Sequence, residues 1–120
     1  MKNITRLVFS VLLFVAAHAA LGCEYPERVT VPNGTTATKE EMLEGQRGVK
    51  NFVATMETYL ACIVEEEKVA RGKIENLSAE EEQQREDMLS KKYNAAVDEM
   101  ERIAAQYNVE VQAFRAKDSS

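Results

Sequence analysis

Two long runs of helical apolar periodicity, separated by one short break, dominate this 120-residue chain. The first run carries an apolar residue at every seventh position: Met42, Val49, Met56, Ile63, Ala70 and Leu77. The second run keeps the spacing of one helix face: Leu89, Tyr93, Val97, Met100, Ile103, Ala104, Tyr107, Val111 and Phe114. Residues at these spacings share one face of an α-helix. The chain is therefore predicted to be all-α, with two amphipathic helices.

Both helices are expected to begin at a capping box, in which a hydroxyl side chain and a glutamate three residues later satisfy each other's backbone N–H. Thr38 and Glu41 have this spacing before the first helix, and Ser78 and Glu81 have it before the second. The predicted helices cover about 39–75 and 79–116 within a hairpin of residues 38–116, and a polar tail, 117–120, is expected to fray.

The two apolar stripes mirror each other about the break near residue 78. The matching pairs are apolar on both sides: Ile63 with Tyr93, Met56 with Met100, Val49 with Tyr107, and Met42 with Phe114. A short loop between amphipathic helices favours antiparallel neighbours. We therefore expect a long antiparallel two-helix hairpin with coiled-coil character. Chance alignment of two heptad-like patterns is the alternative.

Charged residues replace the apolar stripe near the break. Two glutamate triplets, 65–67 and 80–82, lie on either side of it, with four basic residues close by: Lys68, Arg71, Lys73 and Arg85. Charge runs on helices are usually solvated faces, so neither metal binding nor catalysis is expected from these carboxylates. We expect this end of the hairpin to be exposed and less stable than the other end.

The first residues have the layout of a secretory signal peptide. Lys2 and Arg6 form a positive start, Leu7–Ala17 is almost entirely apolar, and Ala17-His18-Ala19 provides small residues at a cleavage site. The apolar run is shorter than the roughly 20 residues that a membrane span needs. We predict a signal peptide over residues 1–19, with cleavage as late as residue 22, and export to the bacterial periplasm without a transmembrane span in the mature chain.

The mature composition excludes several chemistries. Lys2 and Arg6 leave with the signal peptide, so 15 basic residues become 13 against 20 acidic ones, and the formal net charge moves from −5 to −7. An acidic surface disfavours nucleic acid. His18, the single histidine, also leaves, which removes histidine-based catalytic and metal sites. The chain is predicted to be non-enzymatic, with no catalytic residues, no cofactor and no metal.

The two cysteines are expected to form one structural disulfide, Cys23–Cys62, because exported proteins fold in an oxidising compartment. An extended arm over residues 20–37, containing Pro26 and Pro32, precedes the first helix. The helix from 38 to 62 rises about 36 Å. The arm from 38 back to 23 spans up to about 50 Å, so it can run antiparallel along the helix and reach Cys62.

Small residues line the flank of the first helix that would face the arm. Gly48, Asn51, Thr55, Thr58 and Cys62 recur there at helical spacing and would leave a groove, which Tyr25, Val29 and Val31 could fill. Close approach of the arm would also explain Gly45 and Gly48 inside a helix, where glycine costs about 1 kcal/mol relative to alanine. Two alternatives remain: two unrelated free thiols, or acylation of Cys23 as an envelope lipoprotein.

Three segments of the chain resemble small exported helical proteins of proteobacteria that have no established function. They are Pro32–Met42, Met56–Cys62 and Tyr93–Met100. The resemblance covers most of the mature chain and implies a periplasmic location, without an activity to transfer.

Three functions remain open at this level. The first is protein–protein association, with itself or with another protein, because two helices alone cannot hide their apolar faces. If the arm does not cover this surface, a homodimer forming a four-helix bundle is expected. The second is a carrier of a small ligand or lipid held between arm and hairpin. The third is a lipoprotein anchored at Cys23.

Overall fold

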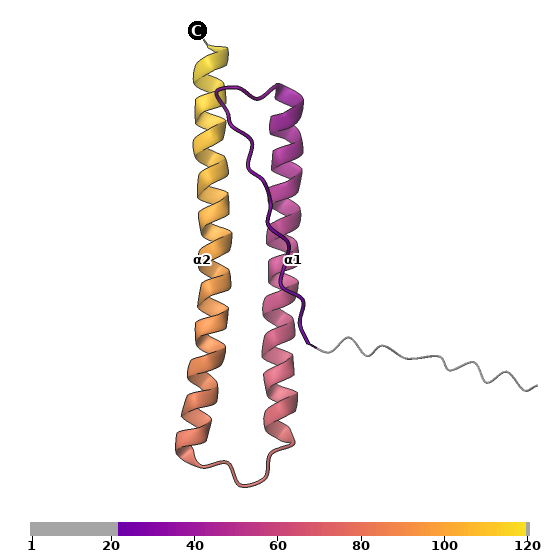
Figure 1. Cartoon of the computed structure of the whole chain (residues 1–120), viewed down its shortest axis with the longest axis vertical. Coiled ribbons are helices and arrows are strands. Elements are labelled where there is room, and N and C mark those ends of the chain that lie inside the picture. The colour runs from indigo at the N-terminus through magenta and orange to yellow at the C-terminus, as the bar shows by residue number, and fades with distance from the viewer. Residues whose placement is uncertain (1–21, 120) are drawn as a thin grey trace, which may run out of the picture.

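The fold is a long antiparallel helical hairpin with an extended arm lying against one face. The computed structural model describes residues 22–119, and the predicted signal peptide, residues 1–19, lies outside them. Helix α1 spans Lys39–Gly72 and helix α2 spans Ala79–Asp118. Figure 1 shows the arm leaving the start of α1 and running toward its middle. Neither of these helices is long and apolar enough to cross a membrane.

Both capping boxes form as predicted. The N–H of Glu41 donates to Thr38 Oγ1 at 3.2 Å, and the N–H of Thr38 donates to Glu41 Oε2 at 2.7 Å. Ser78 and Glu81 make the same pair of bonds at 3.2 and 2.8 Å. These hydrogen bonds lower the pKa of both glutamates below its ordinary value of 4.5, because the cap stabilises the ionised carboxylate. The caps fix where each helix starts.

The C-terminal ends of the helices differ from the prediction. Helix α1 ends at Gly72 rather than near residue 75, because Lys73 caps it and Asn76 takes a positive φ of 60° in the turn. The tail predicted to fray from residue 117 is wrong at its first two residues, which continue α2 to Asp118. Lys117 Nζ donates to the carbonyl of Ala37 at 2.6 Å, which ties the last turn of α2 to the end of the arm.

The two helices pack side by side in the predicted antiparallel orientation. Near the turn, the Arg85 guanidinium donates two hydrogen bonds to the Glu67 carboxylate, at 2.7 and 3.1 Å. At the far end, the Tyr107 hydroxyl donates to the carbonyl of Met42 at 2.8 Å. The two pairs lie at opposite ends of the hairpin, so the register is held along its length.

Four residues of the arm, spaced three apart, lie against α1 or are buried, and Tyr25 and Val31 between them also contact the helices. Cys23 is bonded to Cys62, Pro26 is buried, Val29 lies against Gly48, and Pro32 lies against Gly45. A three-residue period is that of polyproline II, which rises about 3.1 Å per residue and makes no internal hydrogen bonds. Accordingly, residues 24–32 make no hydrogen bond within the described part of the chain. Side-chain contacts therefore hold residues 24–32 against the helices.

Two glycines allow the backbone contacts that seat the arm. A Cβ on Gly45 would lie 2.6 Å from two carbons of the Pro32 ring, and one on Gly34 would overlap the backbone carbonyl of Glu110. At the second contact, the N–H of Gly34 donates to Glu110 Oε2 at 2.7 Å. The predicted close approach of the arm to Gly45 and Gly48 is confirmed. A second close approach, between Gly34 of the arm and the backbone of α2, was not predicted.

The core is confined to the half of the hairpin that the arm covers. Among the described residues, the buried members of α1 stop at Ile63, and those of α2 begin at Ala96. The central cluster is Val49, Phe52, Met56, Leu60, Ile63, Ala96 and Ile103, with Val29 and Val31 of the arm packed against it. Between the end of the described arm and the α1–α2 turn, no described segment covers the two helices (Figure 1). The end of the hairpin near the turn, which we call the tip, is therefore exposed, as expected.

Replacing Gly45 should separate the cost of crowding the arm from the helix propensity of alanine. Gly45→Ala forces the Pro32 ring away, whereas Gly72→Ala meets no atom within 4 Å. Both changes bring a similar gain in propensity, so we expect Gly45→Ala to be less stable than Gly72→Ala by about 1–3 kcal/mol. Urea unfolding followed by circular dichroism measures the difference. Equal stabilities would contradict close packing of the arm at Gly45.

Candidate functional site

The most distinctive chemistry lies where the arm ends on α1. Cys23 and Cys62 form the predicted disulfide, with an S–S distance of 2.02 Å and Cα atoms 5.7 Å apart. Cys62 lies in the middle of α1, and the arm brings Cys23 to it from 39 residues away in sequence. Cys62 is exposed and Cys23 is half-buried, so small molecules can reach the sulfur atoms.

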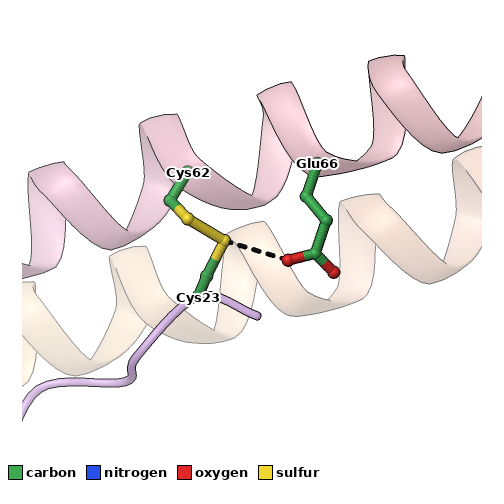
Figure 2. Close-up of a disulfide and its surroundings, with 3 residues drawn as sticks. All are labelled: Cys23, Cys62 and Glu66. Atoms are coloured by element: carbon green, nitrogen blue, oxygen red, sulfur yellow. Dashed lines mark hydrogen bonds between the residues drawn. A yellow bond between two sulfur atoms is a disulfide. The ribbon is translucent and has the colours of Figure 1, made fainter. Parts of the chain in front are cut away.

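A carboxylate lies against this disulfide. Glu66 follows Cys62 by one helical turn, so both side chains lie on the same face of α1. Its Oε2 atom is 3.2 Å from Cys23 Sγ (Figure 2). A disulfide sulfur carries no proton, so this contact is not a hydrogen bond. Glu66 belongs to a charge run that was expected to be solvated, so this contact was not predicted, although the four-residue spacing from Cys62 could have indicated it.

The two cysteines and Glu66 bring three potential metal-ligand atoms within 4.8 Å of one another. Thiolates are the form of cysteine that binds metals. Because the two sulfurs are joined to each other, one carboxylate is left to offer a ligand in the oxidised protein. The arrangement therefore supports thiol–disulfide chemistry rather than a metal centre.

The other carboxylates near the tip have separate roles. Glu67 pairs with Arg85, and its Oε1 is 3.9 Å from Arg71 Nε. Glu81 closes the cap of α2. The predicted counter-charges Arg71 and Arg85 are thus confirmed as partners of Glu67. Neighbouring glutamates therefore differ in role: Glu67 forms ion pairs, whereas Glu66 lies against the disulfide.

Two tyrosines meet beside the disulfide. The rings of Tyr25 and Tyr59 pack edge to face with centroids 5.1 Å apart. Partial burial raises the pKa of Tyr25, and the negative charge of Glu99 on α2 raises it further, while Arg28 opposes the change. Tyr25 therefore fills part of the predicted groove, but half of its surface, 50%, stays exposed.

The rest of that groove remains open. A hollow of about 610 Å³ runs beside the arm and is lined by Asn51, Thr55 and Thr58 together with Tyr25 and Tyr59. The Thr55 hydroxyl donates its proton to the carbonyl of Asn51 at 2.7 Å. The lone pairs of the hydroxyl oxygen can therefore still accept a hydrogen bond from a ligand. Val29 lies against Gly48 at one end of this stripe, and Val31 packs toward the core, so neither covers Thr55 or Thr58. The groove can hold a small molecule with both apolar and hydrogen-bonding groups.

Removing the disulfide should loosen the arm. Closing a loop of this length stabilises a protein by about 4 kcal/mol in the chain-entropy model. We expect the double variant Cys23→Ala, Cys62→Ala to lose up to about 4 kcal/mol in its free energy of unfolding by urea. Trypsin should also cut it faster at Arg28, in the middle of the arm. An unchanged stability together with an unchanged cleavage rate would show that the side-chain contacts alone hold the arm.

No family model matches the chain, and no curated protein and no solved structure is found to be similar to it.

Proposed function

We propose that this chain is a non-enzymatic protein of the bacterial periplasm that acts through protein–protein contacts, primarily with a second copy of itself. The contact surface is the tip patch, which we define as Ala61, Val64, Leu89 and Tyr93. The predicted signal peptide and the resemblance to exported proteins support the location. The disulfide is compatible with it and counts against acylation of Cys23, since the same sulfur would carry the lipid.

Exposed apolar area in the uncovered half of the hairpin carries this proposal. Val64 and Tyr93 keep 43% and 40% of their surface exposed. They lie together at an open hollow of about 420 Å³, and Val64 and Leu89 line a second one of about 460 Å³. No residue of the arm lines either hollow. Contiguous apolar surface of this kind on a small protein marks an interaction site.

A second hairpin is the simplest partner for such a surface. Two hairpins packed tip patch to tip patch give four helices around a shared core, in the coiled-coil-like packing of helical bundles. A two-fold axis makes the contact self-complementary, so one patch serves both copies. The arms lie outside this contact, because they cover the other half of each hairpin.

Light scattering on the purified mature chain tests self-association. We expect a dimer mass in the micromolar range, and we expect Val64→Lys and Tyr93→Lys to raise the dissociation constant at least about tenfold, because each buries a charge in the contact. Val109→Lys is the matched control, since Val109 is 64% exposed and lies outside the tip patch. A wild-type chain that stays monomeric up to high micromolar concentration would contradict the dimer and leave a different protein as the partner.

A carrier function is the second candidate, favoured by the open groove beside the arm. Its lining fits a small amphipathic molecule, with Tyr25 and Tyr59 as the apolar wall and Asn51 as the polar one. Native mass spectrometry of the freshly purified protein would reveal a retained ligand. We expect Thr55→Trp to abolish the retention, because the indole occupies the groove, and a ligand that persists in this variant would place its site elsewhere.

A further inference from the structure

Glu66 places an anionic oxygen directly against the disulfide that fastens the arm. The distance from its Oε2 to Cys23 Sγ is 3.2 Å (Figure 2). Unlike its neighbour Glu67, which pairs with Arg85, Glu66 forms no ion pair within the described part of the chain. Its charge is therefore not neutralised by a cation at contact distance.

We propose that Glu66 is an electrostatic guard of the Cys23–Cys62 disulfide, which slows its opening by anionic thiols and so keeps the arm fastened. This inference does not depend on the proposed self-association. It concerns the disulfide between half-buried Cys23 and exposed Cys62, which a dissolved thiol can reach from the solvent side of α1.

The chemistry of exchange explains how a carboxylate acts at this position. A thiolate attacks one sulfur, the S–S bond breaks, and the other sulfur leaves as a thiolate with the electron pair. A second reductant thiolate then attacks the reductant sulfur of this mixed disulfide and releases the remaining cysteine, so that two cysteine thiols and one oxidised reductant result. In the transition state the entering and leaving sulfurs share one negative charge, so the net charge does not change during the step.

Both directions of attack meet the charge of Glu66. When the reductant attacks Cys62, Cys23 is the leaving group, and its growing negative charge develops beside Oε2 of Glu66. When the reductant attacks Cys23, the anion itself must approach that carboxylate. Like charges repel at either step, and the repulsion between exposed groups is modest but measurable. The guard therefore works whichever sulfur is attacked.

The reduction rate of the folded, oxidised protein tests this proposal with two thiols of different charge. Glutathione carries a net negative charge, and cysteamine carries a positive amine. For glutathione, we expect Glu66→Gln to increase the rate about three- to tenfold, and Glu66→Lys to increase it further. For cysteamine, the same substitutions should increase the rate less or decrease it. Added salt should shrink the glutathione effect, since ions screen exposed charges.

Glu65→Gln is the matched control, because it removes the same charge from the adjacent position without a contact to the sulfur atoms. We expect it to change the glutathione rate less than twofold. Quenched mass spectrometry counts the free thiols, and urea unfolding checks that each oxidised variant is as stable as the wild type. Equal glutathione rates for wild type and Glu66→Gln would overturn the proposal. An equal acceleration with both thiols would overturn it too, since it would indicate easier access rather than a lost charge.

Discussion

The seating of the arm on the glycine-containing face of α1 is the contact on which the rest of the fold depends. Two amphipathic helices lying side by side leave part of each apolar face in water. The arm supplies a third layer through Val29 and Pro32, and glycines at 45 and 48 let it approach the helix backbone. The buried core coincides with this covered half and ends where the arm ends. A domain this small has few other sources of stability.

Residues 24–32 of the arm lie in place without a hydrogen bond to the rest of the described chain, so other terms must offset the entropy that they lose on ordering. Proline at positions 26 and 32 restricts the unfolded chain in advance. The disulfide fastens the start of the arm to α1. At the other end of the arm, Gly34 donates to Glu110 of α2, and Lys117 of α2 donates to the carbonyl of Ala37. The arm is thus fixed at both ends and packed by side chains between them. Past Cys23 no segment that the structure describes covers the helices, and apolar side chains such as Val64 remain exposed there.

Much of this fold could be predicted because its signals are local or periodic. The caps at Thr38 and Ser78, the antiparallel pair of helices, and the reach of the arm to Cys62 were predicted from spacing alone, and all three are present in the structure. The end of α1 at Gly72 was misplaced, since apolar periodicity continues into the turn at Leu77. The helical state of Lys117 was missed because it depends on a partner, Ala37, that is distant in sequence.

The candidate site was predictable only in part, for the same reason. The disulfide follows from the cysteine count, whereas the contact of Glu66 with it requires the position of Cys23 in space. The groove was predicted from the small residues of α1, but the arm was expected to fill it. The groove stays open because the arm packs toward the core rather than over Thr55 and Thr58. Side-chain direction along an extended segment cannot be read from composition.

The three-residue period of the arm also determines how freely its sequence can vary. Positions 23, 26, 29 and 32 face the helices, whereas most residues between them are exposed, namely Glu24, Tyr25, Glu27, Arg28 and Thr30. Residues 24–32 make no hydrogen bond with any residue that the structure describes, so apart from the packing of Tyr25 on Tyr59, little constrains these intervening side chains. Evolution can therefore rewrite the outward chemistry of this segment, from acidic to basic or from polar to aromatic, while the fold beneath it stays the same.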